Sequence, residues 1–551
     1  MTTQVISFES DTIADAMRNQ DDKFIKGALT LTIAGFVVKV IGALYRIPLY
    51  SILGGEAYGL FQMAYPIYAI MLTVSSAGLN VAISKAVAER WALNRKRDAR
   101  GAFRVSLVLM LVIGLAGTIA LYLLRDWIAV NLARDARAAV SIAAISPALF
   151  LASVLSALRG WFQGIEEMTV PAVSQVLEQL GRLATMLLLA RALMPRGLEF
   201  AAAGATFGAA AGAGLGVIYS GLAYRSHAAR ERFREKREKR RMSASGMKEK
   251  PVPPERWERA ARSIMRVAVP ISLASAVFGL TELVDLSLVP GRLHALGIPT
   301  EEATKLYGQL TGIALSLVNL ATVFTGALQM TIVPSVTAAI AVGDRASVRR
   351  RINKALTVTL ALGIPAALGL FVLAEQIPIL LYGQEGVGSI LRSAAPAILF
   401  LAVQQVTAGV LQGMGKIAIP LINLTIAIAV KAVLTYLLVG MPGLGVRGAA
   451  VATSAYFGVA AILNLLAIMR VQRRMLEPGP VLKLALAGAG MALVTALAYA
   501  GGSPLVGVKL ATVGAIGAGA LAYGVLALAF GAIDPADLES IPLLGRILRR
   551  R

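Results

Sequence analysis

The sequence predicts an all-α, polytopic membrane protein. Of its 551 residues, 57% are hydrophobic and only 15% are charged, and the mean hydropathy of +0.70 is far above that of a soluble chain of this length. Runs of about 20 apolar residues recur along the chain, each long enough to cross a hydrocarbon core as a helix. The alternating ten-residue pattern of membrane β-strands is not seen.

About fourteen transmembrane helices are expected. The spans are residues 27–50, 58–83, 102–124, 139–162, 171–194, 200–223, 264–289, 306–333, 355–374, 388–411, 418–439, 446–469, 481–500 and 506–531. Connections rich in Lys and Arg alternate with connections that are poor in them, as the positive-inside rule predicts. We therefore expect a multi-pass protein of the cytoplasmic membrane with both termini in the cytoplasm.

Polar segments suggest how the spans are grouped. We expect a cytoplasmic tail (1–26), an N-lobe of six helices (27–224), a basic cytoplasmic linker (225–263), a C-lobe of six helices (264–470), a final helix pair (471–531) and a C-terminal interfacial helix (532–551). The tail is acidic, unlike the basic start of a signal peptide. We interpret the linker as a topology-setting connection, with binding of anionic lipid as the alternative.

The two lobes look like copies of one six-helix unit. Tyr58-Gly59 matches Tyr307-Gly308 at an offset of 249 residues, and the same offset relates Gly114 to Gly363 and Gly160 to Gly409. A constant offset through Gly, Pro and Gln positions is hard to obtain by chance. An even number of spans keeps the two copies in the same orientation, related by an axis along the membrane normal.

Composition also excludes several classes of function. The net charge of +23 falls mostly in short segments between apolar runs, so nucleic acid is not an expected partner. The chain has no Cys and two His, and it has no GxxxxGK[ST] loop and no assembled nucleophile and base. We expect no metal, no cofactor and no enzyme activity; a Na⁺ or H⁺ gradient, the membrane potential or a partner would supply energy.

Several cations lie inside the apolar spans, where charge is costly and usually faces a protein interior or a wet cavity. Lys39 and Arg46 stand two helical turns apart in KVIGALYRIPL and share one face of the first span. Arg182 and Lys431 occupy equivalent repeat positions near the expected midplane. Arg159, in the repeated RGWFQG segment, either snorkels to the surface or forms the cytoplasmic mouth of a basic cavity.

Three carboxylates accompany these cations. Glu178 stands four residues before Arg182 and is placed to neutralise it. Glu282 and Asp285 are three residues apart in the outer half of their span and share a face. They either pair with Lys39, bind a coupling cation or proton, or line a wet vestibule.

Long stretches of the sequence resemble a known group of transporters. KVIGALYRIPLYSILGGEAYGLFQMAYPIYAIMLTVSSAGLNVAISKAVAE, SPALFLASVLSALRGWFQGIEEMTVPAVSQVLEQLGR and the 6 + 6 + 2 layout resemble the stage V sporulation protein B type of polysaccharide exporters, relatives of the MurJ-type lipid II flippases in the multidrug/oligosaccharidyl-lipid/polysaccharide superfamily. The resemblance covers about residues 27–530. It implies two six-helix lobes around a cationic cavity, a lipid-tail groove at the last two helices, and alternating access.

The resemblance implies that this chain is a bacterial flippase. Its substrate would be an undecaprenyl-pyrophosphate-linked saccharide, lipid II above all, which it would move from the inner to the outer leaflet. Lys39 and Arg46 match the family's paired basic residues by position. Two other cavity arginines of the better-known flippases, in helices 2 and 8, have no counterpart in MAYPIYAI and YGQLTGIA.

Roles for the charged residues follow as hypotheses. We assign Lys39, Arg182 and Lys431 to the phosphate, Arg46 and Arg159 to the outer and inner mouths, and Glu178, Glu282 and Asp285 to gating or ion coupling.

Three alternatives remain at this point. A multidrug or cation exporter of the same superfamily would be expected to use mainly acidic cavity residues. An exporter of another lipid-linked polysaccharide would use the same basic pocket. A scaffold for cell-wall synthesis or sporulation proteins, which are possible partners, would gain nothing from charge placed in the membrane.

Overall fold

The computed structural model describes residues 30–532 apart from 32, 33, 36, 39, 43, 245–256 and 472–477. Within these residues the chain is helical and contains no β-strand, which confirms the all-α prediction. Lys39, the tail (1–26), the end of the linker and nearly all of the expected C-terminal helix (533–551) lie outside the described residues.

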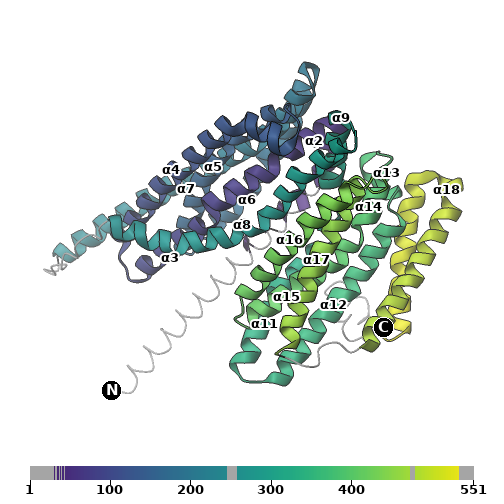
Figure 1. The fold of residues 1–551 in the computed structure, drawn as a ribbon. Helices are drawn as coiled ribbons and strands as arrows, with labels where there is room; N and C mark the ends of the chain where they lie inside the picture. Colours follow the sequence, from purple (N-terminus) through teal and green to yellow (C-terminus); the bar gives the residue numbers. More distant parts are fainter. Residues whose placement is uncertain are drawn as a thin grey trace. The chain divides into compact units, whose positions relative to one another are not determined.

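The chain folds as two units (Figure 1). The first contains residues 1–53, 63–131 and 135–279, and the second contains residues 54–62, 132–134 and 280–551. The chain therefore passes between the two units at residues 54–62, at residues 132–134 and finally at residue 280.

The helices of the first half are α2 (Arg46–Leu72), α3 (Gly78–Ala92), α4 (Lys96–Ile128), α5 (Ala138–Gly164), α6 (Thr169–Leu193) and α7 (Leu198–Ala244). Short π-helical turns, Thr73–Ala77 and Ala129–Ala133, and a 3₁₀ turn, Met194–Arg196, connect some of them. The helix α7 continues through much of the expected linker.

The helices that follow are α8 (Trp257–Ala295), α9 (Thr300–Gly308), α10 (Leu315–Ala321), α11 (Val323–Ala341), α12 (Arg345–Val372), α13 (Gln376–Tyr382), α14 (Gly388–Ala394), α15 (Pro396–Gly413), α16 (Ala418–Val439), α17 (Val446–Met469) and α18 (Pro478–Ala529). A π-helical turn, Gln309–Ala314, separates α9 from α10.

Eleven helices in the described part of the chain are long and apolar enough to cross a membrane, so the chain is a multi-pass membrane protein, and the count of fourteen is not confirmed. Two expected pairs of spans are joined end to end. Gly54 (φ 69°) interrupts α2 and Gly507 (φ 77°) interrupts α18. Both backbones lie in the left-handed region that glycine tolerates. The expected span 306–333 is divided among α9, α10 and α11.

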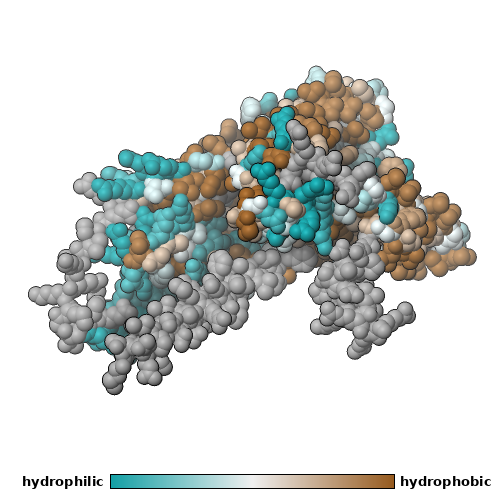
Figure 2. Space-filling model, turned by 90° about the horizontal axis from the view of Figure 1, so that it is seen from below, coloured by the Kyte–Doolittle hydropathy of each residue, from teal (hydrophilic) through white to brown (hydrophobic). Residues whose placement is uncertain are grey.

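Hydrophobic side chains cover large parts of the surface (Figure 2). On α4, one stripe of exposed residues recurs every three or four positions, as expected for a lipid-facing helix. It comprises Val108, Val112, Leu115, Ile119 and Leu123, which are 49–71% exposed. Soluble proteins do not expose contiguous apolar stripes of this kind, so the stripe marks a membrane face.

The same packing recurs in both units at the offset of 249 residues. A Cβ on Gly160 would meet the Ile83 Cβ at 3.0 Å, and a Cβ on Gly409 would meet the Ile332 Cγ2 at 2.8 Å. Each glycine therefore lets α5 or α15 approach a neighbouring helix closely. Since Ile83 and Ile332 are themselves 249 residues apart, the repeat seen in the sequence is also a repeat of contacts.

The second unit includes residues 54–62, which belong to the first half of the sequence. Residues 54–62 pack within it against α9 and the turn that follows, and a Cβ on Gly59 would stand 2.1 Å from the Thr304 carbonyl oxygen. The Tyr58 hydroxyl donates to the Gly312 carbonyl at 3.3 Å. Because Tyr58-Gly59 and Tyr307-Gly308 are repeat equivalents, equivalent segments of the two halves pack against each other here.

Candidate functional site

The first unit holds a cluster of three charged side chains on neighbouring helices. Arg159 comes from the end of α5, and Glu178 and Arg182 lie one turn apart on α6. The Arg159 Nη2 donates to Glu178 Oε2 at 2.8 Å, and the Arg182 Nη2 donates to Glu178 Oε1 at 3.0 Å. One carboxylate therefore bridges two guanidinium groups, which leaves the cluster with a net charge of +1.

Polar neighbours fix the orientation of this cluster. The Arg159 Nε donates to Ser174 Oγ at 2.8 Å, and the Ser174 hydroxyl donates to the Pro171 carbonyl at 2.8 Å. The buried Nε of Arg182 has no acceptor among the described residues. An unpaired buried donor costs free energy until an acceptor arrives, so this atom provides a position for a water or for an acceptor atom of a ligand.

Two tyrosines and a further arginine lie near the same cluster. Tyr65 and Tyr68 pack edge to face with ring centroids 6.2 Å apart, and both lie within electrostatic range of Arg182. Arg46 lies within electrostatic range of Tyr65 as well. The first unit thus brings together three of the predicted cations, Arg46, Arg159 and Arg182. The side chains of Arg159, Glu178 and Arg182 remain 15–19% exposed, so the cluster is accessible from outside the protein interior.

The equivalent position in the second unit has a different environment. The Lys431 Nζ donates to Asp285 Oδ2 at 2.7 Å, and at 3.3 Å to both the carbonyl and the hydroxyl of Thr281. The side chains of Lys431 and Asp285 are only 2% and 4% exposed. This ion pair joins α16 to α8, is electrically neutral and is sealed from solvent.

Unpaired polar atoms accompany the sealed pair. Asp285 Oδ1, the Tyr307 hydroxyl and the Thr435 hydroxyl are buried and have no partner among the described residues. The Tyr456 ring lies under the Lys431 ammonium, with 5.8 Å from Nζ to the ring centroid. Buried unsatisfied atoms next to a buried charge pair are costly, and they provide positions for a water or a transferred proton.

The structure thus places the predicted residues in separate groups. Asp285 pairs with Lys431, an arrangement not considered from the sequence, and Glu282 is exposed on the same helix α8. Lys39 lies outside the described residues. The sequence reasoning missed Ser174, Tyr65 and Tyr68, although the two tyrosines stand three residues apart in MAYPIYAI and so share a helix face.

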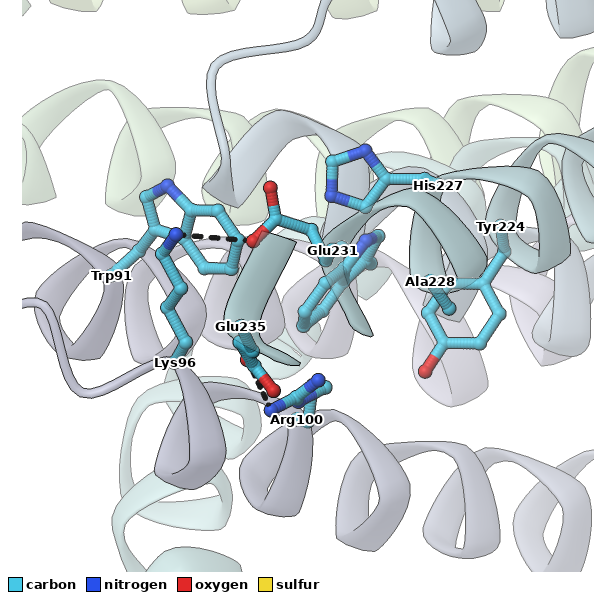
Figure 3. Close-up of a pocket in the computed structure, with 9 residues that line it drawn as sticks. Trp91, Lys96, Arg100, Tyr224, His227, Ala228, Glu231 and Glu235 are labelled. Carbon is cyan, nitrogen blue, oxygen red and sulfur yellow. Dashed lines mark hydrogen bonds and ion pairs between the residues drawn. The ribbon is translucent and has the colours of Figure 1, made fainter. Parts of the chain in front are cut away.

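The pocket drawn in Figure 3 is not a site for a large substrate. It lies between α3, α4, α5 and the far part of α7, and it encloses about 10 Å³, room for a single water. Lys96 and Arg100 reach across it to Glu231 and Glu235 at 3.0 and 2.6 Å. Its contacts hold helices together.

No group of three or more His, Asp or Glu that could hold a metal ion occurs among the described residues.

Comparison with known protein families gives two matches. Residues 24–248 match the polysaccharide biosynthesis protein family, and residues 311–437 match the MatE family.

Three curated proteins of Bacillus subtilis (strain 168) are similar along most of their length. Stage V sporulation protein B is 28% identical over 534 residues, 96% of this chain and 99% of that protein. The uncharacterized membrane protein YabM is 30% identical over 448 residues, 80% of this chain and 79% of that protein. The lipid II flippase MurJ is 25% identical over 473 residues, 81% of this chain and 83% of that protein.

Two solved structures share the fold. The lipid II flippase MurJ in an inward closed conformation superposes with a TM-score of 0.67 at 15% identity, covering 91% of this chain and 98% of that one. An inward-facing multidrug resistance MATE transporter superposes with a TM-score of 0.63 at 18% identity, covering 81% of this chain and 98% of that one. At these identities the likeness shows the fold alone.

The sequence similarity to YabM and stage V sporulation protein B, together with the two family matches, shows the family. The chain is a transporter and not an enzyme, and it belongs to the multidrug/oligosaccharidyl-lipid/polysaccharide superfamily, as a relative of stage V sporulation protein B and the MurJ flippases.

Proposed function

We propose that this transporter is a flippase that moves an undecaprenyl-pyrophosphate-linked saccharide, lipid II first among the candidates, from the inner to the outer leaflet. The observation that carries the proposal is the Arg159–Glu178–Arg182 cluster with its net positive charge, its partial exposure and the unpaired Nε of Arg182. Guanidinium groups match the oxygens of a phosphate in both charge and planar geometry.

In this proposal Glu178 acts as the gate. Its two carboxylate oxygens accept one hydrogen bond each from Arg159 and Arg182, in the positions that two phosphate oxygens of the substrate would take. A pyrophosphate competes with the carboxylate for the same donors, and departure of the lipid lets the carboxylate return. The exchange keeps both guanidinium groups paired throughout, which lowers the cost of moving phosphate charge through a medium of low dielectric constant.

We assign Arg46 to the outer mouth of the same path and Arg159 to the inner mouth. Lys39, outside the described residues, remains a predicted phosphate contact. A role for Lys431 in phosphate binding requires that its pair with Asp285 open, because the ammonium is sealed in this conformation.

We assign Asp285, with Glu282 on the same helix, to gating or ion coupling. Coupling to H⁺ or Na⁺ through Asp285 would use its free Oδ1 and the nearby unpaired hydroxyls.

The rival function, export of drugs or other organic cations, is favoured by one observation. Glu282 and Asp285 on α8 are two carboxylates three residues apart, the residue type that would attract an organic cation. The two functions predict opposite cargo charges, and a transport assay separates them.

The test uses the full chain reconstituted into liposomes with fluorescent lipid II, with an unrelated polyprenyl-pyrophosphate glycan, or with a cationic dye. We expect leaflet exchange of one or both lipids and no dye transport. Comparing exchange with and without a sodium gradient tests the coupling ion. Arg182→Ala should lower exchange at least about tenfold, the effect of losing one charged hydrogen-bond partner.

The control variant is Arg191→Ala, an exposed arginine on the same helix α6, which should leave exchange unchanged. Transport of the dye and not of either lipid would refute the flippase function.

A further inference from the structure

The far part of α7, residues 225–244, forms a helical arm beyond the expected membrane span. The whole helix has 47 residues, about 70 Å of length, roughly twice what a bilayer crossing needs. Two ion pairs fix the arm to α4: Lys96 to Glu231 at 3.0 Å and Arg100 to Glu235 at 2.6 Å (Figure 3). These contacts hold the arm against α4, so the arm belongs to the folded structure of the first unit.

Among the described residues, these ion pairs have no counterpart in the second half of the chain. The repeat equivalents of Lys96 and Arg100 are Arg345 and Arg349, at the start of α12, and both are exposed. In the first half, two bases four residues apart meet two acids four residues apart on a neighbouring helix. The contact between α4 and the arm thus shows that side chains of opposite charge, spaced four residues apart on two segments, can pair along this arm.

A basic stripe lies about 110° around the arm from Glu231 and Glu235. Arg230, Arg234, Arg237 and Arg241 recur every three or four residues and are all exposed, so they share one helix face. Arg234 makes one loose contact, 3.6 Å to Glu231, and is 74% exposed. Beside the stripe, Phe233 is 70% exposed. An exposed aromatic ring next to a row of cations is typical of a surface that binds an anionic partner with an apolar element.

The sequence contains a segment of complementary charge. Residues 1–22 carry five carboxylates, Glu9, Asp11, Asp15, Asp21 and Asp22, against the single cation Arg18, a net charge of −4 in a chain of net charge +23. Asp11 and Asp15 are four residues apart, as are Arg230 and Arg234. Phe8, Ile13 and Met17 supply apolar side chains among these carboxylates.

Chain length and topology permit the contact. Nineteen residues separate Asp11 from Thr30, the first described residue, and such a segment spans up to about 60 Å when extended. Six expected spans lie between the acidic segment and the arm, and an even number returns the chain to the same side of the membrane.

We propose that the acidic N-terminal segment of this chain, residues 1–22, docks on the basic stripe of the arm. Asp11 and Asp15 pair with the stripe as Glu231 and Glu235 pair with α4, and the apolar residues of the segment cover Phe233. Anionic lipid fits less well, because an unbroken continuation of a spanning helix leads away from the bilayer, and lipid charge is screened within about 10 Å.

The natural chain has no cysteine, so crosslinking can be directed to chosen positions. The experiment uses the full-length chain in phosphatidylcholine nanodiscs, with Ala14→Cys combined with either Arg234→Cys or Arg232→Cys, and a short bismaleimide. Arg232 is also exposed and points about 160° away from Arg230 around the helix. Each variant removes one arginine, so the pair is matched in charge.

We expect crosslinking to Arg234→Cys to be about fivefold faster than to Arg232→Cys, the effect of two exposed ion pairs. Asp11→Lys with Asp15→Lys should remove this preference, and adding Arg230→Glu with Arg237→Glu should restore it. Equal rates at the two faces, or a preference that survives the charge reversal, would overturn the proposal.

A second measurement tests for a lipid. The same chains are placed in nanodiscs that contain phosphatidylglycerol, and labelling of Arg234→Cys by a monofunctional maleimide is followed. Protection that is lost in the Asp11→Lys, Asp15→Lys chain supports docking of the tail. Protection that is equally strong in that chain means that lipid covers the stripe, and the proposal fails.

Discussion

Arg182 and Lys431 occupy the same place in the two repeats, yet their surroundings have diverged. Arg182 shares one carboxylate with Arg159, keeps an unpaired Nε and is part of an accessible cluster of net charge +1. Lys431 has a carboxylate of its own, supplied by another helix, and is sealed. The repeat places a cation at the same position in both units, and the partner of each cation decides what that cation can do. An exposed cluster with excess positive charge can bind a ligand. A buried ion pair that is electrically neutral holds helices together.

The largest expected effect tests the sealed pair. Lys431→Met leaves the Asp285 carboxylate buried without its partner and should lower the free energy of unfolding by about 3–5 kcal/mol. Arg182→Met should cost only about 1 kcal/mol, because Glu178 keeps its bond to Arg159. Thermal unfolding of the purified variants in one detergent measures both.

The double variant Lys431→Met, Asp285→Leu is the control for that comparison, and it should recover most of the lost stability because no buried charge remains. If Lys431→Met and Arg182→Met are equally stable, the contrast between the two units is wrong.

The next effect concerns ligand binding. Glu178→Gln removes the negative charge that competes with phosphate and should tighten binding of inorganic pyrophosphate by about tenfold, through one charge-assisted interaction gained. Asp285→Asn should leave pyrophosphate binding unchanged, because its site is closed. Isothermal titration calorimetry gives both affinities. An equal response of the two variants would mean that the ligand reaches both units.

A smaller effect should be the same in both units. Gly160→Ala and Gly409→Ala each push a methyl group into an isoleucine of a neighbouring helix, at 3.0 and 2.8 Å, and each should destabilise the protein by about 1–3 kcal/mol. Gly101→Ala, which meets nothing within 4 Å, serves as the control and should be neutral or slightly stabilising. A large difference in stability between Gly160→Ala and Gly409→Ala would mean that the two units share their backbone arrangement but not their side-chain packing.

The smallest effect lies at the start of two equivalent helices. At the N-cap of α12, the Asp344 side chain accepts from the Ser347 amide at 2.9 Å, whereas Arg95 at the N-cap of α4 makes no side-chain cap bond. The hydrogen bonds from Ser347 lower the pKa of Asp344. The cap therefore stabilises α12 at neutral pH, weakens as pH falls below the unfolded value of about 3.9, and is lost below the folded pKa.

Hydrogen exchange of the first turn at neutral pH checks whether the cap bond stabilises α12. Asp344→Ala should speed amide exchange at Ser347 a fewfold. Arg95→Ala should leave exchange at the corresponding turn of α4 unchanged, because Arg95 makes no side-chain cap bond. Equal fraying of both helices would show that the cap bond adds nothing.

The sequence could predict those features that depend on spacing along one helix or on the repeat. The apolar runs predicted the all-α membrane class, the offset of 249 residues predicted a repeated unit in which Gly160 and Gly409 are equivalent, and the spacing of four predicted the pair of Glu178 with Arg182. Each of these follows from local geometry or internal symmetry.

Contacts between distant helices could not be predicted in this way. Lys431 and Asp285 are 146 residues apart in sequence, and nothing local indicates which of several intramembrane carboxylates meets which cation. The number of spans was not confirmed, because two pairs of expected spans meet at a glycine with non-helical backbone angles, Gly54 in α2 and Gly507 in α18, and each pair then counts as one long helix. Hydropathy does not report that geometry.

The unbroken helix α7 has a mechanical consequence. Its membrane half carries the glycines that pack against α6, including Gly208 and Gly212, and its other half is clamped to α4. A stiff rod of this kind works as a lever: if alternating access tilts the membrane half by about 10°, a tip some 30 Å farther along moves by about 5 Å. Rocking inside the bilayer would thus be converted into a displacement that soluble proteins can sense.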